Sequence, residues 1–307
     1  MEVIHDLESA RVGEDSAVTI GFFDGVHRGH QSVIRRLVAA AGERGLRAVA
    51  VTFDRHPREV LTPDDVPGLL TTTERKARLI EGLGVDLLLV MPFDRETASW
   101  PPERFVDDVL VGALHAKHAA VGANFTFGYR AAGNVEVLTD LGRARGFSVE
   151  GVTLLEVDGR RVSSTSIREA VVEGDLGWPE VALGRRHVLD GVVVPGAGRG
   201  DDLGWPTANV EAHPRVLLPA RGVYAGRGIL DEGTWPAAIN VGINPTFGEE
   251  PLHVEAFLLG FEGDIRGRDI AIEFWERLRD EERFDSPEAL SRQIGKDVER
   301  TRALVGE

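Results

Sequence analysis

The sequence predicts an α/β protein with two domains: a parallel sheet with helices on both faces, followed by an antiparallel β-barrel with a terminal helix. In the first half, apolar runs of strand length alternate with segments of helical periodicity, an order typical of a helix-covered parallel sheet. In the second half, short apolar runs are separated by Gly and Pro turns, which indicates a barrel. A length of 307 residues also favours two domains.

The elements of the first half follow one another with short connections. Strands are predicted at 17–23, 47–53, 85–90, 119–121 and 148–154, and helices at 30–43, 71–83, 136–145 and 166–173. Two of the helix starts rest on capping-box spacing, from Thr71 to Glu74 and from Ser166 to Glu169.

The pattern changes near residues 174–179, so we place the boundary within 176–186 and predict domains at 1–180 and 187–307. The predicted barrel strands are 187–194, 222–230, 235–241, 252–259 and 269–275. Ser286 and Pro287 have the positions of an N-cap and a first helical residue, which predicts the terminal helix.

Composition narrows the class of protein. A net charge of −15 argues against a broad nucleic-acid surface, although a small anionic ligand needs only a local positive cluster. The sequence has no apolar run of about 20 residues and no visible secretory signal. Without Cys, it has no disulfide, thiolate metal site or cysteine nucleophile. We expect a cytoplasmic protein without nucleic-acid or membrane partners, and a homo-oligomer stays open.

The strongest motif is the segment 21–30, Gly-Phe-Phe-Asp-Gly-Val-His-Arg-Gly-His, which follows a strand and opens a helix. Its glycines allow tight turns, and the helix start supplies free N–H groups and a positive dipole end that suit phosphate. His27 and His30 can therefore point at one polyphosphate. Two histidines that are merely packed or solvated remain the alternative, but their position at a strand–loop–helix junction favours function.

This segment resembles the HxGH signature of the nucleotidylyltransferase superfamily. The full ten-residue string is similar to the form of that signature found in the FAD synthetase branch. Segments 52–57, 121–128 and 161–168 resemble further motifs of that branch, in the same order. The resemblance implies a Rossmann-like domain in which a phosphate oxygen of FMN attacks the α-phosphorus of ATP. FAD and pyrophosphate are the products, and Mg²⁺ is expected mainly on ATP oxygens.

The same resemblance implies roles for individual residues. His27 and His30 would be the catalytic phosphate donors, and Asn124, Phe125 and Phe127 would hold the flavin. ATP and its phosphates would be bound by Gly21, Phe22, Asp24, Gly29, Arg161, Ser164, Thr165 and Arg168. Structural alternatives stay open: the two Phe residues could only pack, and Asp24, Ser164 and Thr165 could only cap. His56, before Pro57, could also be structural.

The second half lacks the Gly-x-x-x-x-Gly-Lys-Ser/Thr motif of Walker-type kinases. A Gly-rich loop at 196–204 instead leads to Pro206-Thr207-Ala208-Asn209. Backbone N–H groups of such a loop can wrap phosphates, and the oxygens of Thr207 and Asn209 are hard ligands suited to Mg²⁺. Taken alone, the loop also fits an ordinary hairpin turn.

This string resembles the riboflavin kinase signature, with Trp205 in its aromatic position, and segments 240–247, 253–257 and 279–284 resemble later parts of that family. The chain as a whole thus resembles the bacterial bifunctional riboflavin kinase/FAD synthetases. The resemblance implies phosphoryl transfer from ATP to riboflavin, with Glu255 as general base. The implied phosphate ligands are Gly198, Gly200, Gly204 and Thr207, the implied metal ligands are Thr207 and Asn209, and the implied flavin contact is Arg279.

Two departures and one alternative remain. Asp201 and Asp202 stand where relatives carry basic or neutral residues, which predicts weaker ATP binding at the kinase site. Arg266 stands where relatives usually have Tyr, with no predicted consequence. The alternative function is a different HxGH nucleotidylyltransferase fused to a flavin-binding module.

Overall fold

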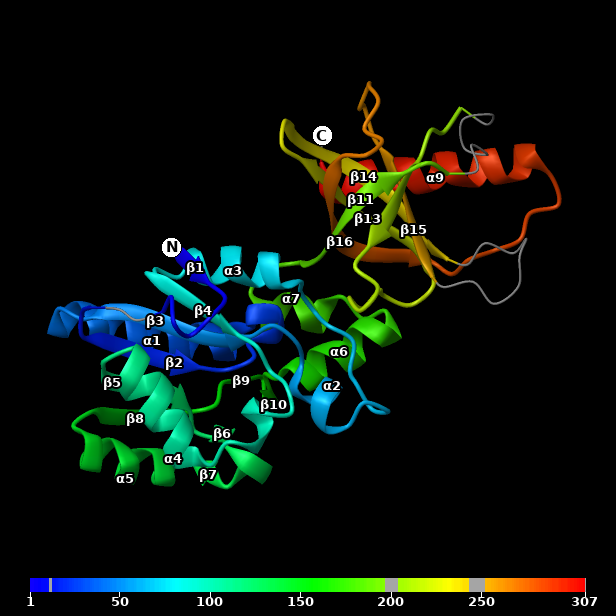
Figure 1. The fold of residues 1–307 in the computed structure, drawn as a ribbon. Helices are drawn as coiled ribbons and strands as arrows, with labels where there is room; N and C mark the ends of the chain where they lie inside the picture. The colour runs from blue at the N-terminus through cyan, green and yellow to red at the C-terminus, as the bar shows by residue number, and fades with distance from the viewer. Residues whose placement is uncertain (11–12, 197–203, 243–251, 307) are drawn as a thin grey trace. The chain divides into compact units, whose positions relative to one another are not determined.

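The computed structural model describes residues 1–10, 13–196, 204–242 and 252–306, which form two compact units (Figure 1). The first unit comprises Met1–Pro67 and Thr73–Ser164, and the second comprises Gly68–Thr72 and Thr165–Glu307. Within the described ranges, no helix is long and apolar enough to cross a membrane.

The first unit is built on a parallel sheet of six strands. In spatial order they are β1 (Glu2–Ile4), β4 (Leu87–Met91), β3 (Arg47–Phe53), β2 (Ser16–Ile20), β5 (Ala116–Gly122) and β8 (Ser148–Val152). The five predicted strands are all present. Strand β1 was not predicted, because three residues are too few to show a pattern.

Helices cover both faces of this sheet, as predicted (Figure 1). On one face lie α1 (Arg28–Arg44) and α3 (Thr73–Glu81), and on the other α4 (Pro102–Phe105), the π-helix Val106–Ala113 and α5 (Val135–Arg145). Successive strand residues serve the two faces, because side chains alternate along a strand. Ala17 packs with Leu37 of α1, whereas Val18 packs with Leu110 and Leu138 on the opposite side.

The chain also contains short elements that periodicity does not reveal. They are the helices Asp24–Val26, α2 (Pro57–Leu61), Thr97–Ser99, Tyr129–Ala131 and α7 (Gly177–Leu183), and the strands β6 (Thr126–Phe127), β7 (Gly133–Asn134), β9 (Glu156–Val157) and β10 (Arg160–Arg161). Helix α7 occupies the stretch in which we placed the domain boundary.

Two predicted helix starts are wrong. Helix α3 begins at Thr73, because Thr71 is buried in the segment that belongs to the second unit. Helix α6 (Ser164–Glu173) begins at Ser164 instead of Ser166. Ser166 lies in its first turn, where its hydroxyl oxygen accepts a hydrogen bond from Nε1 of Trp178 at 3.3 Å.

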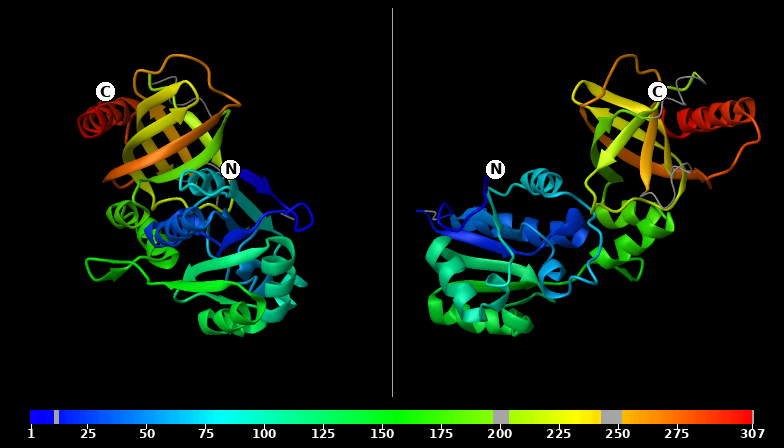
Figure 2. Two further views of the ribbon diagram at one scale, coloured as in Figure 1. Left: turned by 90° about the vertical axis from the view of Figure 1, so that its left-hand side faces the viewer. Right: turned by 45° about the vertical axis from the view of Figure 1, so that its right-hand side comes forward.

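The second unit contains the predicted antiparallel barrel, which is closed (Figure 2). Around it run β11 (His187–Val194), β12 (Ala208–Ala212), β15 (His253–Leu258), β14 (Gly233–Gly242), β13 (Gly222–Leu230) and β16 (Asp269–Arg279). All five predicted strands are present. Only β12 was missed, because its five residues directly follow a loop rich in Gly and Pro.

The terminal helix α9 (Pro287–Val305) lies along the outside of the barrel (Figure 2). Its predicted cap is present, since Oγ of Ser286 accepts a hydrogen bond from the N–H of Ala289 at 3.2 Å. An ion pair joins the helix to β16: Nη2 of Arg279 lies 2.8 Å from Oδ2 of Asp297, whose side chain is only 8% exposed. Gln293 also donates to this carboxylate.

Replacing Asp297 by Ala should lower the free energy of unfolding of the barrel by about 3 kcal/mol, because it leaves the partly buried guanidinium of Arg279 without its carboxylate. Calorimetry of the barrel transition measures the loss. Glu299→Ala, an exposed acidic residue on the same helix, is the matched control and should change stability by less than about 0.5 kcal/mol. Equal effects of the two substitutions would show that the ion pair does not hold the helix.

Candidate active sites

The predicted histidine pair lies at the N-terminus of the 17-residue helix α1. The backbone N–H of His30 donates to Nδ1 of His27 at 3.2 Å, so His27 is the N-cap of the helix. The two imidazole rings stack, with centroids 3.6 Å apart and planes 19° apart. The pair thus sits where the positive end of the helix dipole favours an anion.

The turn that leads to this pair has an unusual backbone. Phe23, Gly25 and Val26 have positive φ values of 54°, 77° and 39°. Such values are costly for a residue with a side chain, above all a β-branched one, and they concentrate at functional sites. The ring of Phe23 contacts His30 edge-on at a centroid distance of 5.3 Å, so the turn also packs against the pair.

Gly29 has a steric role beside His27. A Cβ atom at this position would lie 3.0 Å from Cε1 and 3.1 Å from Nδ1 of the His27 ring. The absence of a side chain therefore lets the imidazole lie against the first turn of the helix. Close packing of the His27 ring therefore explains why residue 29, which we predicted to bind phosphate, is a glycine.

Part of the predicted motif at 161–168 lies against the turn that precedes α1. Oγ of Ser164 donates to the carbonyl oxygen of the buried Asp24 at 3.0 Å. Arg161 lies on the exposed strand β10 of the same unit. Thr165 and Arg168 belong to the second unit, in which Nε of Arg168 donates to the carbonyl oxygen of Gly68 at 2.8 Å.

The predicted flavin contacts lie after β5. Phe125 and Phe127 are half-buried and stack with centroids 5.4 Å apart, and Phe127 also contacts Phe105. Asn124 is exposed. Core packing thus accounts for part of the aromatic pair, and its flavin contact stays a prediction. His56, left open above, caps α2, because its Nδ1 accepts from the N–H of Arg58 at 3.1 Å.

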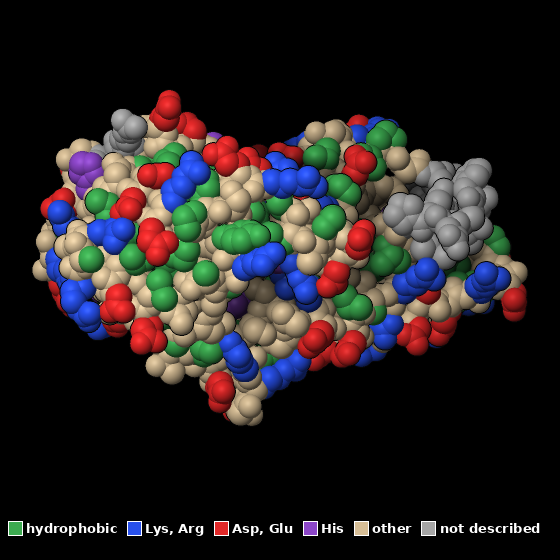
Figure 3. Space-filling view, turned by 60° about the horizontal axis from the view of Figure 1, so that its bottom comes forward, with side chains coloured by type: hydrophobic (Ala, Val, Ile, Leu, Met, Phe, Trp, Pro, Cys, Tyr) green, Lys and Arg blue, Asp and Glu red, His purple; other side chains and the backbone are tan. Residues whose placement is uncertain are grey.

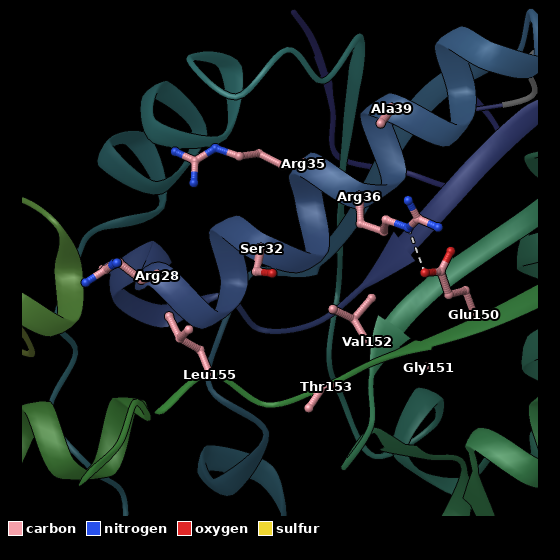
Figure 4. Close-up of a pocket in the computed structure, with 10 residues that line it drawn as sticks. All are labelled: Arg28, Ser32, Arg35, Arg36, Ala39, Glu150, Gly151, Val152, Thr153 and Leu155. Atoms are coloured by element: carbon pink, nitrogen blue, oxygen red, sulfur yellow. Dashed lines mark hydrogen bonds and ion pairs between the residues drawn. The ribbon is translucent and has the colours of Figure 1, made fainter. Parts of the chain in front are cut away.

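A pocket of about 700 Å³ lies between α1 and the end of β8 (Figure 4). Arg28, Ser32, Arg35 and Arg36 line it from the helix, and Arg36 donates to Glu150 at 2.7 Å. Arg28 at the start of α1 and Arg35 in its middle suit a nucleotide or another anion, whereas Arg36 is paired with Glu150. All three were missed in the sequence, although their spacing places them on one helix face. The face of the molecule shown in Figure 3 mixes acidic and basic side chains.

The barrel carries a second group of predicted site residues. Glu255 on β15 is directly opposite Asn209 on β12 and Asn240 on β14. Their strand neighbours Val210 and Val254 are buried in the barrel, so the three polar residues lie on its outer face. The register thus places one carboxylate between two amides, with Cβ atoms about 5 Å apart. Asn240 was not assigned a role from the sequence, because opposition across strands leaves no sequence spacing.

Backbone and side-chain groups lie close to the three polar residues Asn209, Glu255 and Asn240. A Cβ on Gly196 would lie 1.9 Å from Nδ2 of Asn209, so the backbone at the start of the Gly-rich loop touches that amide. A Cβ on Gly242 would lie 2.0 Å from Oε1 of Glu281, another residue without a predicted role. Nε2 of His253 lies 3.6 Å from Oε1 of Glu255.

The remaining kinase predictions have mixed outcomes. Thr207 is half-buried just before β12, and Gly204 has a positive φ of 78°. Gly198, Gly200, Asp201 and Asp202 lie outside the described residues. Arg279 is engaged by Asp297 as described, so packing accounts for its position and its flavin role stays a prediction. Arg266 forms an exposed ion pair with Asp264.

Comparison with known proteins gives a family for each half of the chain. The FAD synthetase family matches residues 9–166, and the riboflavin kinase family matches residues 183–305. A protein of Pseudomonas fluorescens named bifunctional riboflavin kinase/FMN adenylyltransferase is 39% identical over 99% of this chain and 98% of its own length. The chain belongs to this bifunctional family. A family member from Bacillus subtilis is 37% identical over 92% of this chain and 90% of its own length.

A solved structure shows the same fold. It is described as a macrolide-efflux protein from Streptococcus pneumoniae, is 30% identical, and matches with a TM-score of 0.90. The match covers 98% of this chain and 99% of that chain. The parallel-sheet fold and the barrel fold thus occur together in another protein.

Replacing Gly29 by Ala should lower FAD formation from FMN and ATP about tenfold, because the new Cβ displaces the His27 ring by a few tenths of an ångström. FMN formation in the barrel should not change. Gly42→Ala, in the same helix with open space around its Cβ position, is the matched control and should leave both rates unchanged. Equal FAD formation by both variants would remove the steric role of Gly29.

Proposed function

We propose that the two activities of this family are divided between the units: the barrel phosphorylates riboflavin to FMN, and the parallel-sheet unit converts FMN to FAD. The observation that carries this assignment is the presence of two differently built sites in one chain. One is the stacked pair His27 and His30 at a helix N-terminus, and the other is Glu255 between the amides of Asn209 and Asn240. ATP is the phosphorus donor in both reactions.

In the first unit, the reaction is adenylyl transfer. A phosphate oxygen of FMN forms a bond to the α-phosphorus of ATP, while the bond from that phosphorus to the β-phosphate oxygen breaks and releases pyrophosphate. No covalent enzyme intermediate is needed. His27 and His30 hold the phosphates and stabilise their charge, and the dipole of α1 acts in the same direction.

Other residues of the first unit orient the substrates. Ser164 braces the turn through the carbonyl of Asp24, and the arginines of the pocket beside α1 attract the nucleotide. Asn124, Phe125 and Phe127 hold the flavin, and Arg161 contacts the phosphates. For Thr165 and Arg168, which belong to the second unit, a phosphate contact stays an expectation of the family resemblance alone. These roles follow from the family resemblance, together with the positions described above.

In the barrel, the reaction is phosphoryl transfer. Glu255 accepts the proton of the terminal ribityl hydroxyl of riboflavin as its oxygen attacks the γ-phosphorus of ATP, and ADP leaves. Asn240 lies directly opposite Glu255 and is placed to orient the hydroxyl or the carboxylate. Gly196, at the start of the Gly-rich loop, touches Asn209. The phosphate contacts of Gly198, Gly200 and Gly204 stay an expectation of the family resemblance.

Mg²⁺ fits the donor set of the barrel site. The hydroxyl of Thr207 and the amide oxygen of Asn209 are hard ligands, and Asn209 lies next to the proposed base. The described residues contain no group of three His, Cys, Asp or Glu side chains that could hold a metal ion alone. Phosphate oxygens of ATP and water would therefore complete the coordination, and the ion would offset phosphate charge during transfer.

Several expectations stand as proposals. We propose domains at 1–180 and 187–307, with the boundary within 176–186. The family matches leave residues 167–182 between them. A cytoplasmic location and the absence of nucleic-acid partners stay predictions from composition.

Glu255→Gln should lower FMN formation from riboflavin by about 10²–10⁴-fold through loss of the base, and leave FAD formation from supplied FMN intact. His30→Ala should lower FAD formation by about 10²-fold and leave FMN formation intact. A time course with riboflavin, ATP and Mg²⁺, with the three flavins separated by chromatography, measures both steps.

Exposed residues of the same types supply the controls: Glu262→Gln for the barrel and His5→Ala for the first unit. Both should behave as the unmodified chain, which should form FMN first and FAD after it. FMN without FAD would favour another acceptor for the first unit, as in the alternative nucleotidylyltransferase function. No product from either riboflavin or FMN would contradict the proposal.

Asn209→Ala should raise the Mg²⁺ concentration needed for half-maximal FMN formation about tenfold, and leave the Mg²⁺ requirement of FAD formation unchanged. The reason is that Asn209 supplies a metal ligand only to the barrel site. Titrating Mg²⁺ into the metal-free protein with each substrate measures both requirements. An unchanged Mg²⁺ requirement for FMN formation would exclude Asn209 as a ligand.

A further inference from the structure

A buried lysine lies behind the histidine-bearing turn of the first unit. The side chain belongs to Lys76 on α3, which is 2% exposed, whereas Lys117 and Lys296, the other lysines of the chain, are exposed. Its Nζ donates to the carbonyl oxygen of Phe22 at 3.0 Å and to Oγ1 of Thr52 at 3.1 Å. The ammonium also lies 4.3 Å from the centroid of the Phe22 ring.

These contacts are made where the turn begins. The last ladder hydrogen bond of this stretch runs from the N–H of Gly21 to the carbonyl of Val51. One residue further on, the carbonyl of Phe22 accepts from Nζ of Lys76 and from Oγ1 of Thr52, each at 3.0 Å. Directly after it the backbone enters the left-handed region at Phe23. Two donors thus orient the peptide group from which the turn to the histidines starts.

Three carboxylates and one imidazole surround this region. Burial lowers the pKa of Lys76 to about 8, against the opposing influence of Asp24, Asp54 and Glu74. His56 contacts the same Phe22 ring, at a centroid distance of 4.8 Å. The ammonium is therefore still mostly protonated at pH 7, in a position where burial disfavours its charge.

The lowered pKa of Lys76 means that its charge destabilises the folded chain, so stability alone does not explain why a lysine is buried here. Because the folded pKa lies below the value of about 10.4 for a free lysine, the unfolded chain binds the extra proton between about pH 8 and 10.4. The free energy of unfolding thus rises with pH in that window, and at pH 7 the charge works against folding. A side chain of similar length without charge would not carry this cost.

Size explains why the position holds lysine. Lysine is rare in this chain, with 3 of the 35 basic residues, and the rest are arginine. An ammonium is a compact group with three donors, whereas a guanidinium is a larger planar fork. The short distances from Nζ to the Phe22 carbonyl and to Thr52 suit the smaller group.

We propose that Lys76 is a positioning residue for adenylyl transfer, whose ammonium orients the turn carrying His27 and His30 and adds positive charge behind the phosphate site. The inference rests on the proposed assignment of FAD formation to the first unit. Bound ATP phosphates favour the protonated amine, so substrate binding and the charge of Lys76 strengthen each other.

The test compares Lys76→Met, which removes charge and donors at similar length, with Lys76→Arg, which keeps the charge. At pH 7, Lys76→Met should lower kcat/KM for ATP in FAD formation at least tenfold, while FMN formation and the thermal midpoint do not fall. Lys76→Arg should retain more FAD formation than Lys76→Met. Lys117→Met, at an exposed lysine of the same unit, is the matched control and should change neither rate.

A pH profile separates positioning from a structural role. In the unmodified chain, kcat/KM for ATP in FAD formation should fall above about pH 8, and this decline should be absent in Lys76→Met. A flat pH profile of the unmodified chain from pH 7 to 9.5 would overturn the inference, and this outcome does not depend on how well the variant folds. The same decline in Lys76→Met as in the unmodified chain would also overturn it. Failure of the unmodified chain to form FAD at any pH would instead contradict the proposed function.

Discussion

The first unit depends on the turn between β2 and α1, which must present two imidazoles at the end of a helix within a few residues of a buried strand. Three residues with positive φ make the reversal possible, and two of them, Phe23 and Val26, carry a side chain and are costly there unless neighbouring groups hold them. Those neighbours come from distant parts of the chain: Ser164 holds the carbonyl of Asp24, while Thr52 and Lys76 hold that of Phe22. The functional turn is thus a product of the whole unit.

In the barrel, the register of the strands brings the proposed site residues together. Its site lies on three adjacent strands, and Asn209, Glu255 and Asn240 face one another only in the pairing that is present. A slip by one residue would turn each of them to the opposite face and expose the valines beside them. Closure of the barrel leaves no free edge along which such a slip could start. The same packing that forms the core therefore sets the spacing of the proposed base and the metal ligand.

Much of this architecture is predictable from the sequence, and the failures have physical causes. Most strands with continuous apolar runs and most helices with an apolar stripe were found, since both signals lie within one element. The helical stretch 102–113 was missed, although its buried residues are apolar. The helix starts at Thr71 and Ser166 were wrong because the capping-box spacing also occurs where no cap forms. Ser166, for example, lies inside the helix and its hydroxyl accepts a hydrogen bond from Trp178. Strand β12 and the short helices carry too few residues for any period to show.

The sequence by itself determined the order of the elements, the two-part organisation and the motifs that carry phosphate chemistry, because these depend on residues close together along the chain. The cap of His27 on His30 is of this kind, since a spacing of three suffices to make it. Tertiary structure alone decided that Lys76 is buried beneath the turn, that Asn240 faces Glu255, and that Asp297 engages Arg279. Desolvation, strand register and ion pairing depend on which distant segments meet, and no local pattern in the sequence records that.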